Sequence, residues 1–338
     1  MSPSRTGVIA PAVEGGCSVC GHRTHDLVCS AAEVRAQLEF LAAFHRRRLR
    51  ERADSSELAD RSDFTQSDAK DVVACASCGL VFRASPPGED ESKETYARDR
   101  YGRDRLCALF ASQRELYAVK SKRFAKLGEL GRDARIAEVG SFVGGFLAAA
   151  RDRGWRAVGI DPGEEVAAFC REQGFDVLAT TASEAAIDAA SVDGVAIWNT
   201  FDQLPDPEPT LAAVRRWLRP GGLLAIRVPN GTCFRSAVAR LRRGPSPLSG
   251  PLLSALAWNN LLAFPYLYGH STQTLERLLS AHGFARIAVD GDMLTRLADD
   301  DTKVWARWEE RLSKLAWRTL VRARLAEPPW LDAYFRAG

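Results

Sequence analysis

The stretch "EVGSFVGGF", residues 138–146, is the clearest indicator of the fold in this chain and directly follows the short apolar run "RIA". A strand that ends at Glu138 and Gly140, followed by a turn and a glycine pair that opens a helix, forms a nucleotide-binding unit, because glycines let the backbone approach a ligand closely. The dinucleotide fingerprint G-x-G-x-x-G would require a glycine at position 142. That position is Phe142, so the fingerprint fails at its central glycine.

The failed fingerprint favours an adenosine ligand that has no pyrophosphate, and such a ligand needs no anion-binding helix N-terminus. An acidic residue at the end of the second strand is then expected to hold the ribose hydroxyls. The run "AVGIDP" places Asp161 there, 23 residues after Glu138. A carboxylate can accept hydrogen bonds from both hydroxyls at once.

Strands and helices alternate around this unit. Strands are expected at 135–139, 157–161, 177–180, 194–199, 223–228 and 285–290, and "PPWLDAYFR" can return as a last strand. Helices are expected at 104–128, 144–153, 164–173, 207–218 and 271–282. Because parallel strands need crossover helices, this alternation predicts a doubly wound, mostly parallel α/β sheet of the Rossmann-like type.

Four stretches then carry a resemblance to a known family. They are "AEVGSFVGGFLAAARDRGWRAVGIDP", "GVAIWNTFDQLPDP", "VRRWLRPGGLLAIRVPN" and "STQTLERLLSAHGF". Together they cover about 135–290 and resemble class I S-adenosylmethionine-dependent methyltransferases, in the order of that family. The N-terminal CxxC pairs, "DFTQ" and "CGLVFR" are similar to a subgroup with a zinc ribbon ahead of this domain, to which sugar C-methyltransferases are related.

The resemblance implies which residues contact the cofactor. It assigns the glycine-rich turn to the methionine end of S-adenosylmethionine, the acid after the second strand to the ribose, and "WNTFDQL" to the wall below the sulfonium. The expected contacts are Glu138, Gly140, Ser141, Phe142, Gly144, Gly145, Asp161, Pro162, Asn199 and Thr200. Phe142 departs from the family, which has a glycine there.

Methyl transfer asks for an aligned acceptor and a dry site, and a base only if the acceptor must lose a proton. Gln203 stands where the family often has a histidine, and an amide cannot act as a base at neutral pH. The candidate catalytic residues are therefore His270, in "YLYGHSTQ", and Asp202, although His270 is equally suited to a structural role. Four tyrosines are candidates for the acceptor site or for the core: Tyr96, Tyr101, Tyr266 and Tyr268.

Two CxxC pairs predict a metal site. Cys17 and Cys20 stand in "CSVCG", and Cys75 and Cys78 stand in "CASCG", with 54 residues between the pairs. Each pair places two thiolates on one tight knuckle, and two knuckles complete a tetrahedral four-cysteine zinc site. A closed shell of four thiolates predicts a structural zinc, and the helical pattern between the pairs accounts for the long spacing.

Composition and charge set the broad class. The chain has 338 residues, 46% of them hydrophobic and 26% charged, with a net charge of +3, which by itself indicates neither nucleic acid nor membrane. The N-terminus lacks the apolar core of a secretory signal, so we expect a cytoplasmic protein with reduced thiols. The apolar segment 250–269 has Asn259, Asn260 and Pro265 in its body, which favours a buried or lid-forming segment over a membrane span.

We expect two domains, a zinc ribbon with a helical insert over 1–90 and the methyltransferase domain over 91–338. Residues 231–268 are expected to form a lid insert, and 83–94 read as a linker. Near the C-terminus, "TKVWARWEERLSKLAWRTLVRARL" predicts an amphipathic helix with Trp305 and Leu312 on its apolar face. The simplest expectation is that this face docks on its own domain.

The expected function is methyl transfer from S-adenosylmethionine to a small-molecule acceptor, namely a sugar nucleotide, a polysaccharide or a secondary-metabolite intermediate. No nucleic-acid partner and no stable membrane insertion are expected. Two alternatives stay open: a nicotinamide-dependent oxidoreductase, and a non-catalytic zinc-ribbon interaction protein whose methyltransferase domain has decayed. Phe142 and Gln203 are the residues that keep the second alternative open.

Overall fold

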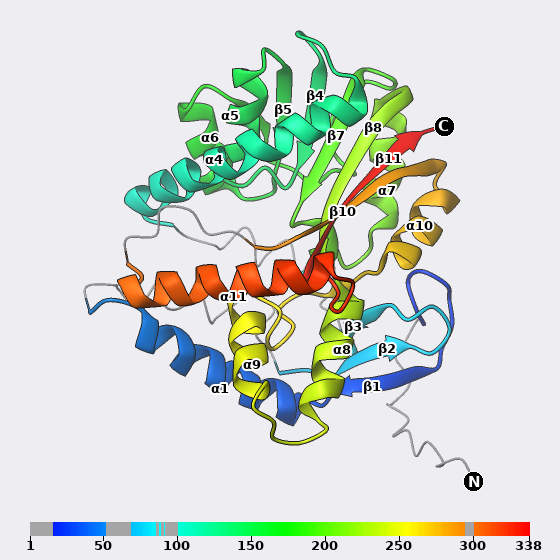
Figure 1. The fold of residues 1–338 in the computed structure, drawn as a ribbon. Helices are drawn as coiled ribbons and strands as arrows, with labels where there is room; N and C mark the ends of the chain where they lie inside the picture. The colour runs from blue at the N-terminus through cyan, green and yellow to red at the C-terminus, as the bar shows by residue number, and fades with distance from the viewer. Residues whose placement is uncertain (1–15, 52–68, 86–87, 89–90, 92–100, 295–300) are drawn as a thin grey trace.

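The computed structural model describes residues 16–51, 69–85, 88, 91, 101–294 and 301–338. A large sheet has the strand order β10-β11-β8-β7-β4-β5-β6 (Figure 1). Its strands are β4 (Arg135–Val139), β5 (Arg156–Ile160), β6 (Asp176–Leu178), β7 (Val192–Trp198), β8 (Leu218–Pro229), β10 (Phe284–Asp292) and β11 (Trp330–Ala337).

Five neighbouring strands of this sheet, from β6 to β8, run parallel, and β11 runs antiparallel to both β8 and β10. The chain proceeds from β4 outward through β5 to β6, and then returns to the other side of β4 with β7. The strand order therefore reverses next to β4, and ligands of open α/β sheets bind at such a reversal, beyond the carboxyl ends of the strands. The predicted doubly wound, mostly parallel sheet is confirmed.

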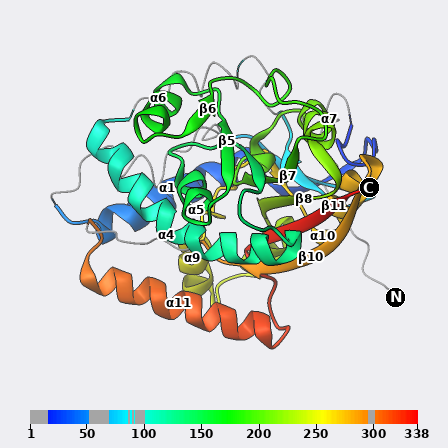
Figure 2. The ribbon, with the colours of Figure 1, turned by 90° about the horizontal axis from the view of Figure 1, so that it is seen from above.

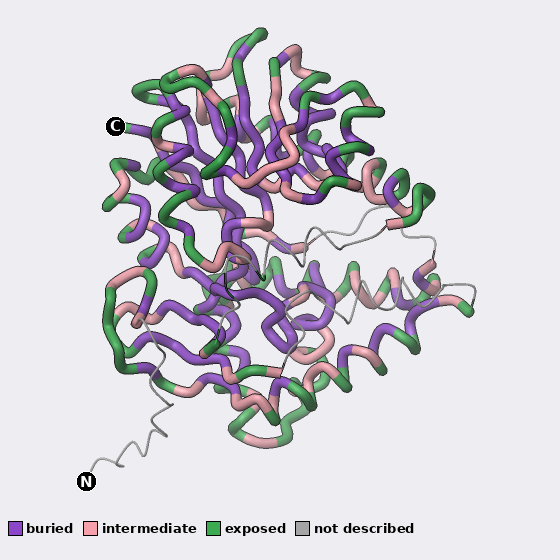
Figure 3. The backbone as a smooth tube through the Cα atoms, turned by 180° about the vertical axis from the view of Figure 1, so that it is seen from behind, coloured by how far each residue is buried: buried purple, intermediate pink, exposed green. Residues whose placement is uncertain are grey.

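Helices cover both faces of the large sheet. They are α4 (Arg103–Gly128), α5 (Gly145–Asp152), α6 (Glu164–Glu172), α7 (Glu208–Trp217) and α10 (Thr272–Ala281), with the short 3-10 helix η1 (Phe201–Gln203). On one face, Phe124 of α4 and Phe146 of α5 pack against Ile136. On the other face, Trp217 of α7 and Leu275 of α10 join a second core. Figure 3 shows the buried backbone concentrated along the strands between these layers.

A second, smaller sheet is antiparallel and has the order β1-β2-β3-β9. Its strands are β1 (His25–Cys29), β2 (Val72–Cys75), β3 (Val81–Arg83) and β9 (Tyr268–Gly269). Helix α1 (Ala31–Arg48) lies between β1 and β2 in the chain, where the helical insert is expected. Ser30 and Glu33 form a capping box that fixes its first turn.

The segment between β8 and β9 folds into α8 (Gly231–Leu241) and α9 (Ser249–Trp258). These helices share one hydrophobic core with α1, in which Phe44 contacts Trp258 with ring centroids 5.3 Å apart. This core joins the N-terminal segment to the proposed lid. Both the division of the chain at residue 90 and the lid over 231–268 stay predictions. Among the described residues, no helix combines the length and the apolar character that a bilayer span requires.

Helix α11 (Val304–Arg322) corrects an expectation. Its apolar residues are not buried against the domain, because Leu312 is exposed by 61% and Trp305 by 46%. Trp305 meets the protein through Arg47 and Arg48 of α1, whose guanidinium carbons lie 5.9 and 5.5 Å from its ring centroid. The side that faces the protein carries Ala306, Lys314 and Trp317 instead. Polar contacts hold that side, because the Trp317 indole N–H donates to the carbonyl of Glu327 at 2.9 Å and Lys314 Nζ donates to the carbonyl of Leu294.

Two further expectations, the linker and the candidate Tyr96, fall largely or wholly outside the described residues. The linker over 83–94 is described only at residues 83–85, 88 and 91, and Tyr96 is not described. Of the other candidate tyrosines, Tyr266 packs on Trp330 with ring centroids 5.2 Å apart, and the Tyr268 hydroxyl donates to the carbonyl of Pro205 at 2.8 Å.

Candidate functional site

The glycine-rich turn joins β4 to α5 at the point where the strand order reverses. Gly140 has a φ of 72°, and a Cβ at this position would lie 2.0 Å from Oγ1 of Thr200. A Cβ at Gly145 would lie 2.4 Å from Cβ of Gln113 on α4. Both positions therefore exclude a side chain, because the turn packs closely against Thr200, after β7, and against α4.

Phe142 occupies the centre of the turn. The residue has a φ of 44°, and its backbone N–H donates to Oδ2 of Asp161 at 2.8 Å. Its ring meets the edge of Tyr101, with centroids 5.4 Å apart, and its carbonyl accepts from Sγ of Cys170 at 3.1 Å. Contacts with Asp161, Tyr101 and Cys170 thus hold Phe142 in the left-handed region, which a residue with a side chain rarely adopts.

Asp161 follows β5, where an acid that binds ribose is expected. Its Oδ1 accepts from the N–H of Gly163 at 2.9 Å, and its Oδ2 accepts from the N–H of Phe142. Burial raises the pKa of Asp161, and the two backbone N–H groups oppose this rise. Each carboxylate oxygen keeps a second acceptor position, so the side chain can still receive hydroxyl donors.

Several buried polar atoms at the carboxyl ends of β4 and β7 have no hydrogen-bond partner within the described chain. They are Oε2 of Glu138, Oγ of Ser141, Oδ1 of Asn199 and both carboxylate oxygens of Asp202. Buried polar atoms are costly unless they are paired, so such a cluster indicates a ligand that carries the missing groups. Most of these atoms accept hydrogen bonds, which fits the ammonium and hydroxyl donors of S-adenosylmethionine.

Glu138 is the member of this group that lies within β4 itself. Burial, and secondarily the negative charge of Asp161, raises the pKa of Glu138 well above its ordinary range. A cationic group beside this carboxyl would favour its charged form. The glycine turn, the unpartnered acceptors and this carboxyl together fit an amino-acid end of a ligand above β4.

Asp202 and Gln203 lie in η1, directly after β7. Asp202 is fully buried, and burial raises the pKa of its carboxyl to about 8. Nε2 of Gln203 donates to the carbonyl of Asn199 at 2.7 Å. Gln203, which replaces the family's histidine, therefore fixes the backbone of the loop that carries Asn199 and Asp202.

His270 follows β9 and is 2% exposed. Its Nδ1 lies 3.4 Å from Oγ1 of Thr274, and its ring centroid lies 5.7 Å from that of Phe201. Burial lowers the pKa of His270 to about 3, so the imidazole is neutral at physiological pH and a weak base. Thr200 and Pro162, two further expected cofactor contacts, are partly exposed at the carboxyl ends of β7 and β5.

The four cysteines of the CxxC pairs come together at one end of the small sheet. Their Sγ atoms all lie within 4.8 Å of one another, and Cys17 to Cys78 and Cys20 to Cys75 are each 3.5 Å apart. Four sulfur atoms about 2.3 Å from a tetrahedral zinc are about 3.8 Å apart, so this cluster fits the ion. Gly79, with a φ of 78°, provides the turn after the second pair.

Other potential ligands nearby are not part of this cluster. His25 lies in β1 with its ring against Phe82, and Sγ of Cys29 accepts from Nε2 of Gln37 at 3.4 Å. The four-cysteine cluster is consistent with a structural zinc, because no coordination position is left for a substrate.

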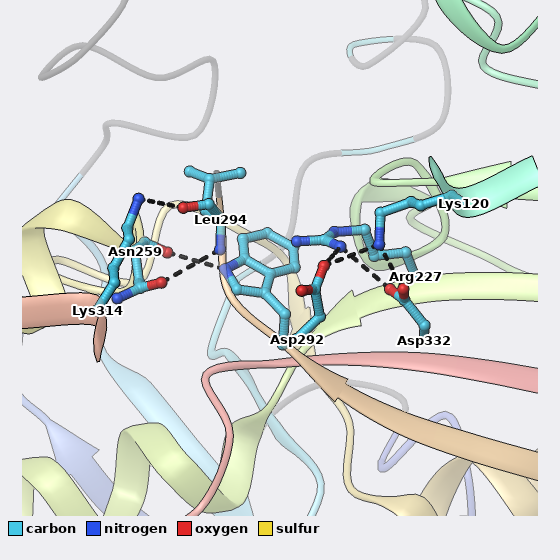
Figure 4. A network of polar contacts seen from close by, with 8 residues as sticks. Lys120, Arg227, Asn259, Asp292, Leu294, Lys314 and Asp332 are labelled. Atoms are coloured by element: carbon cyan, nitrogen blue, oxygen red, sulfur yellow. Dashed lines mark hydrogen bonds and ion pairs between the residues drawn. The ribbon is translucent and has the colours of Figure 1, made fainter. Parts of the chain in front are cut away.

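A buried ionic network lies beside the cluster of acceptors and was not anticipated from the sequence (Figure 4). Nη1 of Arg227 on β8 donates to Asp332 on β11 at 3.1 Å and to Asp292 on β10. Nζ of Lys120 on α4 donates to the same two aspartates and lies 5.7 Å from the ring of Trp198. A signal was available, because Arg227 and Asp332 interrupt the apolar runs "LLAIRVP" and "WLDAYF", and a charge in a buried strand needs a partner.

The seven-stranded order with an antiparallel β11, together with the glycine turn and the acid after β5, defines the nucleotide-binding fold of class I methyltransferases. The model of a methyltransferase domain family matches residues 110–289, and the chain belongs to this family. It is an S-adenosylmethionine-dependent methyltransferase.

Solved structures similar to this chain include S-adenosylmethionine-dependent methyltransferases from Archaeoglobus fulgidus and Aquifex aeolicus. The first is 18% identical over 66% of this chain and 94% of the other, with a TM-score of 0.44, and the second is 14% identical over 71% and 100%, with a TM-score of 0.43. Phosphoethanolamine N-methyltransferase 2 of Haemonchus contortus is 14% identical over 76% and 61%, with a TM-score of 0.46. No curated protein matches the chain in sequence.

Proposed function

We propose that this protein transfers a methyl group from S-adenosylmethionine to a small-molecule acceptor, of the class of sugar nucleotides, polysaccharides or secondary-metabolite intermediates. The observation that carries the cofactor part is the group of unpartnered buried acceptors around the glycine turn, at the carboxyl edge of β4. S-adenosylmethionine supplies a methyl group that its sulfonium already activates, so the protein has to bind, align and exclude water.

Each expected cofactor residue has a distinct proposed role. The Glu138 carboxyl and the turn formed by Gly140, Ser141, Phe142, Gly144 and Gly145 hold the amino-acid end. Asp161, braced by two backbone N–H groups, accepts from the ribose hydroxyls, and Pro162 shapes the turn beside it. Asn199 and Thr200 form the wall next to the reacting centre.

We propose Asp202 as the base for an acceptor that must lose a proton. Its carboxyl is unpartnered and lies in the loop after β7, and a pKa near the working pH is well suited to proton transfer. His270 is the other candidate. With a pKa lowered to about 3, it is better suited to orienting neighbouring groups than to taking a proton.

The proposed acceptor wall is the segment 231–268, which lies between β8 and β9. It packs against α1 in a shared core, so we propose a preformed wall whose closure would have to involve α1 as well. Of the arginines at its start, Arg242 already forms an ion pair with Glu33 at 2.7 Å, which leaves Arg240 and Arg243 as candidates for an acidic group on the acceptor. The four thiols of the metal cluster favour a reducing compartment, in keeping with a cytoplasmic enzyme.

The test is calorimetric titration of an Asp161→Ala variant with S-adenosylmethionine. Charge-assisted hydrogen bonds contribute about 1.5–3 kcal/mol, so the affinity should fall roughly 10- to 150-fold. Asp176→Ala, which removes an exposed carboxylate from the neighbouring β6, is the matched control and should bind like the wild type. An unchanged affinity of the Asp161→Ala variant would show that this residue does not hold the ribose.

A further inference from the structure

Helix α11 presents a row of large apolar side chains to solvent. Trp305, Trp308, Leu312 and Leu315 are exposed by 46%, 57%, 61% and 60%. They recur at spacings of three and four residues, so they form one stripe along the helix. Figure 2 shows α11 along one edge of the molecule, outside the layers that cover the large sheet. Leaving such a stripe in water is unusual and marks an interaction surface.

The charges beside this stripe are all positive. Arg311, Arg318 and Arg322 are exposed along the same helix. The two acidic residues of α11 are engaged elsewhere, because Glu309 pairs with Arg48 at 2.7 Å and Glu310 pairs with Lys314. The outward side of α11 therefore combines aromatic and aliphatic residues with arginines and has no unpaired carboxylate.

We propose that α11 binds the surface of a lipid bilayer that contains anionic headgroups. A helix of 19 residues is about 28 Å long, and an amphipathic helix of this kind lies in the plane of the interface, with its apolar stripe below the headgroups. Tryptophan favours that interfacial depth, and arginines are attracted to anionic lipids. This binding is peripheral and involves no membrane-spanning segment.

Two other occupants fit the surface less well. In a symmetric dimer on this face, the arginine row of one copy would lie beside that of the other, and like charges would oppose association. A protein partner would need carboxylates spaced along the whole helix to match its arginines, whereas an anionic bilayer presents negative charge along its full length. The exposed Leu325, at 65%, extends the apolar surface beyond the end of the helix.

The experiment is flotation of the full chain with vesicles. One set contains phosphatidylcholine alone, and the other contains equal parts of phosphatidylcholine and phosphatidylglycerol. We expect the wild type to float with the anionic vesicles and to stay behind with the neutral ones, and its tryptophan emission should shift to shorter wavelength on binding. An Arg311→Gln/Arg318→Gln variant should bind anionic vesicles roughly 25-fold more weakly, since each arginine near the surface contributes about fivefold.

A Trp308→Gln/Leu312→Gln variant should lose flotation while retaining its circular dichroism spectrum and its affinity for S-adenosylmethionine. Val119→Gln and Leu248→Gln, exposed by 66% and 74% on other elements, are the matched controls and should float like the wild type. The proposal is overturned if the wild type does not float, or if the Trp308→Gln/Leu312→Gln variant floats equally well. A dimer in light scattering that this variant dissociates would assign the surface to a second copy instead.

Discussion

Asp202 shows at the scale of a single residue how position controls chemistry. It lies in the loop after β7, and the backbone N–H of Leu267 donates to its carbonyl at 3.1 Å, which brings the segment before β9 over it. Burial raises the pKa of the carboxyl to about 8. The carboxyl therefore carries a proton at neutral pH. It can take a proton from the methyl-accepting substrate only after it has lost its own, as the pH rises.

This shift has a consequence for stability. The folded state binds the proton up to about pH 8, whereas an unfolded aspartate releases it near its ordinary pKa of about 3.9. Between these values the unfolded state binds fewer protons, so the free energy of unfolding contributed by this group decreases as the pH rises. Asp202→Asn removes the titration and should flatten the fall in melting temperature between about pH 5 and pH 8.

Thermal unfolding of Asp202→Asn and of the wild type across this range checks the prediction. Asp188→Asn, an exposed position after β6, is the control and should keep the wild-type slope. If Asp202 is also the base, methyl transfer by the wild type should increase toward pH 8, and this increase should be absent in Asp202→Asn. Identical pH slopes of stability in the two proteins would contradict the buried, protonated state of the carboxyl.

The sequence alone predicts the positions of some of these site residues but not of others. The places of Gly140 and Asp161 directly after β4 and β5 could be predicted, because each belongs to a local β-turn-α unit. The burial of Asp202 could not be foreseen, because it depends on a segment 65 residues further along the chain. The anchoring of Phe142 by Tyr101 and Cys170 likewise depends on contacts between distant elements.

At the scale of the elements, β9 connects the metal cluster to the proposed site. It consists only of Tyr268 and Gly269, yet it pairs with β3, whose partner β2 ends at Cys75. The next residue is His270, whose carbonyl accepts from the N–H of Gly231 at 2.9 Å. Strand β9 is too short to show a hydrophobic periodicity, and its partner β3 lies far away in the sequence. The sequence therefore does not predict β9.

Removing one thiolate should therefore release the metal and loosen β9. We expect purified wild-type protein to contain about one zinc per chain and Cys75→Ser to contain much less, since a structural site needs all four ligands. Affinity for S-adenosylmethionine should be affected less than methyl transfer, because the glycine turn belongs to the other sheet. Metal analysis and calorimetry on the same preparations measure both effects.

Cys107→Ser is the matched control, because Cys107 is an exposed thiol on α4 that lies outside the cluster. It should retain zinc and bind the cofactor like the wild type. Full retention of zinc by Cys75→Ser would show that the four cysteines do not form the metal site.

The buried ionic network also connects several elements. Arg227 and Asp332 pair across neighbouring strands, and Lys120 joins them from α4. Removing one member of such a buried group leaves an uncompensated charge and costs about 3–5 kcal/mol. The network thereby ties β8, β10 and β11 to the helix that packs over the glycine turn.

At the scale of the whole molecule, the large sheet could be predicted and the arrangement around it could not. Each β-α unit is encoded locally by an apolar run, a turn and an amphipathic helix, so a doubly wound, mostly parallel sheet follows from general rules of connection, although the strand order itself was not predicted. Helices α1, α8 and α9 share one core although α1 is far from the other two in the sequence, and no local sequence pattern predicts that contact. The pattern of α11 predicted a helix correctly, but which face is buried depends on polar contacts such as Arg48 with Glu309.

Calorimetric titration of the full chain tests most directly whether the glycine turn after β4 and Asp161 bind S-adenosylmethionine. The same preparation is titrated with S-adenosylmethionine and with NAD. We predict saturable binding of S-adenosylmethionine at about one site per chain and no binding of NAD, because the turn lacks the central glycine of the dinucleotide fingerprint. If the protein binds NAD but not S-adenosylmethionine, or binds neither ligand, the assignment of this site is contradicted.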